Sequence, residues 1–150
     1  MNTAGIDLAM VDALSFLDSE EKTVLQSLCA VVELPAGGVL FRTGDAATAV
    51  YFLVSGRVAV QKNTGFAEKM QVVALLDAGA PVGEGAAVTG QRRGATVVAI
   101  ENCHLLSIEE QELQTLRRSN PNLAWKIMMK LLHVAHLRLQ KSSERLAHIM

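Results

Sequence analysis

Residues 83–97 read GEGAAVTGQRRGATV, and the rest of the chain is organised around this segment. Strand-like stretches lie on both sides of it, over residues 69–76 and 95–100. Glycines and small residues let a ligand approach the backbone closely, and free N–H groups there can point at an anion. An arginine can hold a phosphate through parallel hydrogen bonds, and a carboxylate can accept one from a sugar hydroxyl. The segment therefore favours a ligand that carries a phosphate and a ribose.

The segment resembles the phosphate-binding cassette of cyclic-nucleotide-binding domains. Residues 83–87 match the Gly-Glu of that cassette and the small residues after it, and residues 93–97 match its Arg-small-Ala-Thr-Val ending. The nine-residue separation of Glu84 and Arg93 is also that of protein kinase A regulatory subunits. The resemblance implies that Glu84 holds the ribose 2′-hydroxyl and that Arg93 pairs with the cyclic phosphate.

The same resemblance implies further ligand contacts. The N–H groups of Gly85 and Ala86, at the start of a short helix, would add to the anion site, and Thr96 stands where the family has a hydroxyl near the base or phosphate. Arg92 fills a spacer in which proline is common, so it is an alternative to Arg93, although the spacing favours Arg93. Outside this context an arginine pair is usually a solvated patch. The predicted ligand-binding residues of the cassette are Gly83, Glu84, Gly85, Ala86, Arg92, Arg93, Gly94, Ala95 and Thr96.

Length and composition predict a globular domain with its own core. The chain has 150 residues, 50% of them hydrophobic, and a net charge of −1. This balance argues against direct nucleic-acid binding, which needs clustered Lys and Arg. No apolar run approaches the roughly 18 residues of a membrane span, and the N-terminus lacks the features of a signal peptide. Cys29 and Cys103 lack a CxxC pattern, so we expect buried free thiols and a cytoplasmic protein.

The middle of the chain alternates short apolar runs with turns. Seven or eight such strands predict a mainly β fold with flanking helices, which is an antiparallel β-roll of jelly-roll type with N-terminal helices and a long C-terminal helix. Ser55-Gly56 predicts a tight hairpin between two of the strands. The resemblance places roll turns at Gly37, Gly38 and Gly44. The predicted strands cover residues 31–34, 39–42, 50–54, 57–61, 69–76, 95–100 and 104–107.

We expect one domain over residues 1–150. Residues 1–30 are predicted to form two N-terminal helices, an amphipathic one over Ile6–Phe16 and a second one with Ser19 as its N-cap. Residues 31–108 are predicted to form the roll with its cassette, and residues 109–150 the C-terminal helices.

Two capping patterns place the C-terminal helices. Ser107-Ile108-Glu109-Glu110 is a capping-box pattern that predicts a helix over residues 109–119. Asn120 then caps the last helix, which has Pro121 at its first position.

The last helix carries two apolar stripes. One has heptad spacing and predicts a homodimer through this helix; it comprises Met128, Leu132, Ala135, Leu139, Ser142, Leu146 and Ile149. The other stripe, Ile127, Leu131 and Val134, is predicted to face the roll. The alternative is a single helix that folds back on its own roll.

Residues 139–145, LQKSSER, resemble the central helix of the bacterial catabolite activator family, where two such helices form the dimer axis. In that family a Thr-Ser pair touches the adenine, so the resemblance implies that Ser142 and Ser143 bind the ligand. A solvated serine pair is the alternative. Activators continue into a helix-turn-helix, which this sequence lacks, so we expect a stand-alone sensor or the sensory part of a longer regulator.

The sequence thus favours a non-enzymatic sensor for a 3′,5′-cyclic nucleotide, with cAMP or cGMP as the ligand and no other cofactor or metal. Members of the kinase branch that select cGMP often carry Thr or Ser after the phosphate arginine. Gly94 stands there, which implies cAMP. The main alternative is a module for another ligand, such as a cyclic dinucleotide or haem, or for none.

A cupin-type metalloenzyme is a more distant alternative. It requires strand histidines around a metal. Here His133, His136 and His148 lie in the predicted last helix and only His104 lies in a predicted strand.

Overall fold

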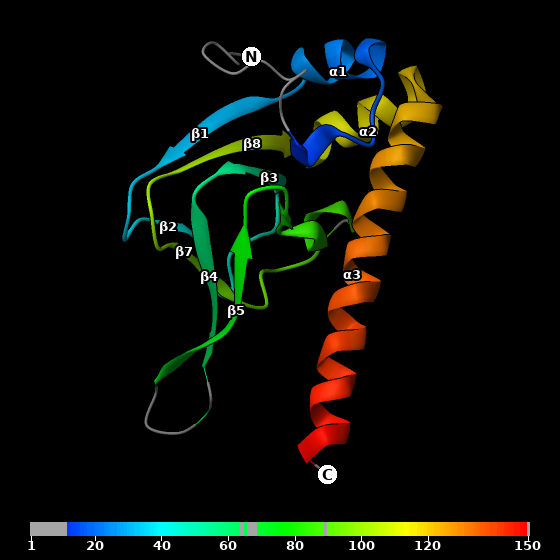
Figure 1. Cartoon of the computed structure of the whole chain (residues 1–150). Helices are drawn as coiled ribbons and strands as arrows, with labels where there is room; N and C mark the ends of the chain where they lie inside the picture. The colour runs from blue at the N-terminus through cyan, green and yellow to red at the C-terminus, as the bar shows by residue number, and fades with distance from the viewer. Residues whose placement is uncertain (1–11, 64, 66–68, 89, 150) are drawn as a thin grey trace.

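The structure is a computed structural model that describes residues 12–149 except 64, 66–68 and 89. Two four-stranded antiparallel sheets form its centre, ordered β1-β8-β3-β6 and β2-β7-β4-β5 (Figure 1). The predicted mainly β roll is therefore confirmed. The strands are β1 (Ala30–Leu34), β2 (Val39–Phe41), β3 (Ala49–Ser55), β4 (Arg57–Asn63), β5 (Met70–Asp77), β6 (Pro81–Val82), β7 (Thr96–Ala99) and β8 (Cys103–Glu109).

The sheet that contains β3 and β8 lies in the middle of the molecule. Successive side chains on a strand point to opposite faces. Val50 and Phe52 of β3 accordingly pack toward the helices, whereas Leu53 packs with Val58 and Val97 of the other sheet. Each face of this sheet thus covers one hydrophobic core.

The predicted hairpin at Ser55-Gly56 is wrong. Strands β3 and β4 belong to different sheets, and β4 pairs with β5 and β7. Gly56 turns the chain from one sheet to the other with a φ of +93°, and a Cβ at this position would lie 2.5 Å from the Asn102 carbonyl oxygen. A corner and a hairpin need the same left-handed glycine, so the local sequence does not separate them.

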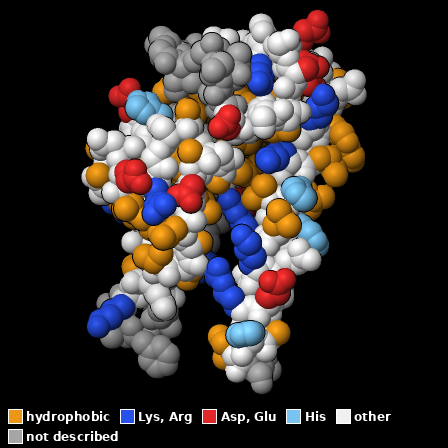
Figure 2. Space-filling view, viewed as in Figure 1, with side chains coloured by type: hydrophobic (Ala, Val, Ile, Leu, Met, Phe, Trp, Pro, Cys, Tyr) orange, Lys and Arg blue, Asp and Glu red, His pale blue; other side chains and the backbone are white. Residues whose placement is uncertain are grey.

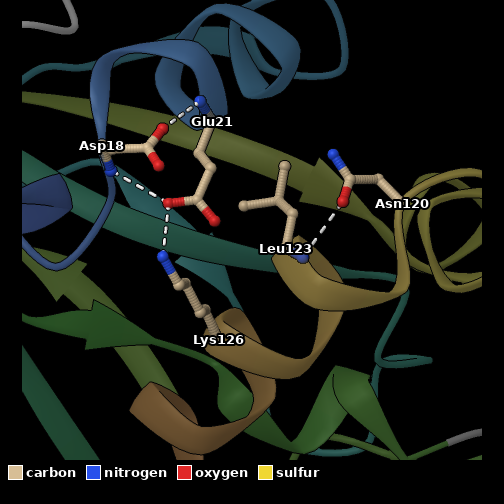
Figure 3. Close-up of polar contacts among 5 residues, drawn as sticks. All are labelled: Asp18, Glu21, Asn120, Leu123 and Lys126. Atoms are coloured by element: carbon tan, nitrogen blue, oxygen red, sulfur yellow. Dashed lines mark hydrogen bonds and ion pairs between the residues drawn. The ribbon is translucent and has the colours of Figure 1, made fainter.

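Helix α1 (Ser19–Gln26) starts one residue earlier than its predicted cap implies. Asp18 is the N-cap, and its carboxylate accepts from the Glu21 N–H at 2.8 Å. The Glu21 carboxylate in turn accepts from the Asp18 N–H and forms an ion pair with Lys126 at 2.7 Å (Figure 3). Ser19 is therefore not the cap. The capping box at the start of α1 also ties this helix to the last one.

The N-terminal helices are otherwise only partly described. A 3-10 turn, η2 (Asp12–Leu14), overlaps the predicted first helix, and residues 6–11 of that prediction lie outside the described residues. The second predicted helix extended to about residue 30, but α1 ends at Gln26 and Ala30 already begins β1.

The C-terminal helices are α2 (Glu110–Ser119) and α3 (Pro121–Ile149). The predicted capping box at Ser107 is wrong, because Ser107 lies within β8 and pairs with Ala30 and Tyr51. The cap at Asn120 is confirmed: its side-chain oxygen accepts from the Leu123 N–H at 3.3 Å (Figure 3).

Helix α3 packs on the roll through its N-terminal half. Leu123, Ile127 and Leu131 are buried and Val134 is half-buried, as predicted for the stripe that faces the roll. Beyond Leu131, no described residue of α3 is buried, and the helix continues along the side of the roll (Figure 1). Within the described residues, no helix combines the length and apolar character needed to cross a bilayer.

Candidate functional site

A groove of about 700 Å³ lies between the roll and α3. One wall is the cassette, with Gly83, Glu84 and Gly85 on one side and residues 92–95 on the other. Residues 73–76 of β5 form a second wall, and α3 closes the groove with Arg138, Lys141, Ser142 and Arg145. This volume lies in the upper half of the range of about 300–1,000 Å³ typical of small-molecule pockets.

Arg93 lies at the inner end of the groove and is only 7% exposed. Its Nη1 donates to the Gly83 carbonyl at 3.0 Å and its Nη2 to the Ala49 carbonyl at 2.6 Å. The guanidinium carbon lies 4.0 Å from the centre of the Phe41 ring. Burial lowers the pKa of Arg93, partly offset by Tyr51, but a guanidinium stays protonated in proteins. A fixed positive charge thus lies beneath the cassette.

One N–H group of Arg93 makes no hydrogen bond. Its Nε is buried and has no hydrogen-bond partner among the described residues. Buried donors are normally satisfied, so the expected partner of this one is an ordered water or a ligand atom.

Gly83 allows Arg93 to come this close. Its φ is +73°, which a glycine adopts without strain. A Cβ at this position would lie 2.5 Å from Arg93 Nη1, so a side chain here would displace the guanidinium. Residues 84–87 follow as the 3-10 turn η3 (Glu84–Ala87), which points the Glu84 carboxylate toward α3.

Arg138 of α3 is a candidate site residue that the sequence did not predict. Its Nη1 donates to both Glu84 carboxylate oxygens at 3.0 Å, and its Nη2 donates to the Pro81 carbonyl at 2.7 Å. Arg138 stands four residues before Ser142 and therefore lies one turn earlier on the same helix face. That spacing, applied to the predicted Ser142 contact, is the signal that points to Arg138.

The structure brings together most of the predicted site residues but not all of them. The residues that line the groove are Gly83, Glu84, Gly85, Arg92, Arg93, Gly94, Ala95 and Ser142. Ala86 instead packs in the core, and its N–H donates to the Gly83 carbonyl at 3.2 Å. The Thr96 hydroxyl accepts from the Thr43 N–H at 3.0 Å, away from the groove. Ser143 is exposed on α3 and does not line the groove.

Arg92 and Arg93 have different environments. Arg92 is exposed at the groove edge, where its Nη1 donates to the Gly44 carbonyl at 2.9 Å. Arg93 is the buried member of the pair, held from three directions by Gly83, Ala49 and Phe41. The arrangement favours Arg93 as the preorganised anion ligand and gives Arg92 a peripheral position.

Metal chemistry has little support in the described part of the chain. No group of three or more His, Cys, Asp or Glu side chains is arranged there to hold a metal ion. His133 and His136 are exposed on α3.

Fold and site together define a ligand-binding β-roll with a preorganised anion site. The family model described as the cyclic nucleotide-binding domain matches residues 31–120, from β1 to the end of α2. The chain belongs to the cyclic nucleotide-binding domain family.

Two relatives illustrate the range of proteins that carry this domain. The chain is 30% identical over 124 residues to the cAMP-activated global transcriptional regulator CRP of Salmonella typhimurium. It is 36% identical over 91 residues to a cyclic nucleotide-gated potassium channel of Rhizobium etli. These matches cover 82% and 61% of this chain but 57% and 24% of the relatives, so the chain spans less than two thirds of either relative.

Solved structures with the same fold include whole sensor domains. A cyclic nucleotide-binding domain from Methylobacillus flagellatus superposes with a TM-score of 0.83 at 25% identity, over 89% of this chain and 75% of that one. The catabolite activator protein of Thermus thermophilus superposes with a TM-score of 0.75 at 26% identity, over 92% of this chain and 62% of that one.

Proposed function

We propose that this domain binds a 3′,5′-cyclic nucleotide monophosphate, with cAMP favoured, and relays its presence through α3. The pair formed by Glu84 and Arg138 carries the proposal. Glu84 is the cassette carboxylate that would accept from a ribose 2′-hydroxyl, and Arg138 already donates to both of its oxygens. A ligand at Glu84 would change the hydrogen bonding of Arg138 and thereby the position of α3.

The phosphate end of the proposed ligand is assigned to Arg93. A guanidinium has five N–H donors, and two backbone carbonyls take up only part of the donors of Arg93. Its buried Nε is the donor that a phosphate oxygen would satisfy. The Salmonella relative supports this ligand class because it is a cAMP-activated regulator.

The preference for cAMP rests on Gly94 and Ser142, which both line the groove. Gly94 has no side chain to meet the guanine amino group, whereas the Ser142 hydroxyl is the proposed partner of the adenine amino group. One neutral hydrogen bond is worth about 0.5–1.5 kcal/mol, so we expect cAMP to bind up to about tenfold more tightly than cGMP.

Calorimetric titration of the purified chain with cAMP and with cGMP tests this function. We expect cAMP to bind in the micromolar range or tighter, and the affinity ratio to shift toward cGMP in Gly94→Thr. Absence of binding for both nucleotides at millimolar concentration would rule out the proposed function. Equal affinities would remove the cAMP preference alone.

Tryptophan fluorescence can report the proposed movement of α3, because Trp125 is the single tryptophan of the chain and lies exposed on this helix. We expect cAMP to change the fluorescence of Trp125, and Arg138→Gln to reduce that change when the site is saturated. A full change in the variant at saturation would show that Arg138 does not carry the relay.

We also propose a homodimer through the apolar seam of α3 and a cytoplasmic location.

A further inference from the structure

The groove is far more basic than one cyclic phosphate requires. Among the described residues Glu84 is the only acidic one that lines the groove, whereas the chain as a whole has a net charge of −1. Figure 2 shows Lys and Arg side chains gathered along the hollow between the roll and α3. The basic residues that line the groove are Lys62, Arg92, Arg93, Arg138, Lys141 and Arg145.

Three of these cations have partners. Arg93 and Arg92 donate to backbone carbonyls, and Arg138 neutralises Glu84. A cyclic monophosphate carries one negative charge, which Arg93 balances. The other three cations are Lys62, Lys141 and Arg145, all exposed, and they have no hydrogen bond or ion pair with any described residue.

The unpartnered cations line the groove from both sides, with Lys141 and Arg145 on α3 and Lys62 on the roll. Arg138, Lys141 and Arg145 follow one another at i, i+3 and i+7, so they share one face of α3. Arg145 lies about 10 Å beyond Arg138 along the helix axis. Lys62 lies near the end of β4, on the roll side of the same groove. Clustered like charges repel one another, and an anion between them removes that cost.

Lys62, Lys141 and Arg145 therefore form a candidate anion site. Helix α3 itself offers few carboxylates that could neutralise these cations. Glu144 is the only acidic residue within α3. Val73 and Leu75 of β5 line the groove and are 40% and 52% exposed, which provides an apolar surface for a nucleobase. Phosphate and base together are the chemistry of a second nucleotide.

We propose that Lys62, Lys141 and Arg145 form a second phosphodiester site, so that the groove holds two nucleotide phosphates at once. This inference rests on the proposed function, because it places the first phosphate at Arg93. The second phosphate comes either from the other half of a cyclic dinucleotide or from a second molecule of cyclic mononucleotide. The chemistry at the site is the same in both cases.

The experiment titrates the chain with cAMP, cyclic di-AMP and cyclic di-GMP at 0.1 M and 1 M NaCl. A dinucleotide source predicts one cyclic dinucleotide per chain, bound at least tenfold more tightly than cAMP. A mononucleotide source predicts two cAMP molecules per chain. A single cAMP per chain, with both dinucleotides bound no more tightly than cAMP, overturns the proposal but leaves the proposed function intact. Failure of every nucleotide to bind overturns both.

A double variant, Lys141→Gln with Arg145→Gln, locates the second phosphate. We expect it to weaken the cyclic dinucleotide, or the second cAMP, at least tenfold more than the first cAMP. Arg117→Gln with Arg118→Gln removes the same charge from exposed positions of α2 outside the groove. Circular dichroism checks that both variants fold.

The salt dependence of binding and the α2 variant together test whether the cations contact the phosphate directly or only attract it from a distance. The screening length falls from about 10 Å at 0.1 M to about 3 Å at 1 M, so the loss caused by removing exposed phosphate contacts should shrink at 1 M NaCl. A loss of the same size in the α2 variant at 0.1 M NaCl overturns the proposal.

Discussion

Arg93 supports the cassette from below as well as facing the groove. It joins Gly83 and Ala49, two parts of the backbone on opposite sides of it, and its plane lies against Phe41. These contacts fix the guanidinium before any ligand arrives. Preorganisation of this kind raises affinity because less side-chain freedom is lost on binding.

Substitution of Arg93 should therefore affect binding and stability together. A hydrogen bond to a charged group is worth about 1.5–3 kcal/mol, so Arg93→Ala should weaken cAMP binding by about ten- to a hundredfold or more. It also leaves the buried Ala49 carbonyl without its donor, so the melting temperature should fall. Arg93→Lys should recover little, since an ammonium lacks the planar fork.

Arg92→Ala is the matched control for that experiment, because it removes the same charge from the exposed neighbour. We expect a smaller loss of cAMP affinity and little change in melting temperature. Calorimetry and a thermal melt measure both quantities. A large binding loss in Arg92→Ala with none in Arg93→Ala would assign the phosphate to Arg92.

At the residue scale, the sequence identified the cassette but not Arg138, the α3 residue that contacts it. Glu84 and Arg93 are close in sequence, so a linear pattern finds them. Arg138 lies 54 residues beyond Glu84, and only the packing of α3 against the cassette brings the two together. Ala86 and Thr96 fit the family pattern, yet the η3 turn and the Thr43 contact direct them away from the groove.

Among the elements, the strands were easier to predict than the connections between them. A short apolar run between turns indicates a strand by itself, and β3 and β5 lie within a residue of their predicted bounds at each end. The partner of a strand depends on distant residues, as the corner at Gly56 shows. Caps are similarly ambiguous where two capping residues adjoin, as Asp18 and Ser19 do.

That ambiguity gives a prediction for α1. Asp18→Ala removes the N-cap carboxylate, and loss of such a cap costs about 0.5–2 kcal/mol. The change also weakens the capping box that orients Glu21 toward Lys126. Ser19→Ala removes a hydroxyl next to it and should change stability by less than about 0.5 kcal/mol. Chemical denaturation of both variants measures the difference; a larger loss in Ser19→Ala would restore Ser19 as the cap.

For the whole molecule, α3 is the element through which the proposed ligand, the roll and the proposed partner would be linked. Its first half is anchored in the core by Leu123, Ile127 and Leu131. Its second half carries the groove cations on one face, and exposed apolar residues of the predicted seam lie along both halves of the helix. Those exposed residues of the predicted seam are Met128, Leu132, Leu139, Leu146 and Ile149. Apolar side chains in a row at heptad spacing favour a second helix as their cover.

A homodimer through this seam is the prediction that concerns the whole molecule. Leu139 is 66% exposed and is the central one of the seven seam residues. Leu139→Glu would bury a carboxylate against the partner helix, which is costly without a paired cation. We expect the wild-type chain to be a dimer by light scattering and Leu139→Glu to be a monomer with the same circular dichroism spectrum.

Leu137→Glu is the matched control, because Leu137 is also exposed on α3 but points about 160° away from Leu139 at 100° per residue. It should remain a dimer. Ser142 belongs to both the seam and the groove wall, so a partner helix on the seam lies beside the ligand. Dimerisation and nucleotide affinity are then linked, and cAMP should bind more weakly to the Leu139→Glu monomer than to the Leu137→Glu dimer. A wild-type chain that stays monomeric at high concentration would exclude the dimer and with it this linkage.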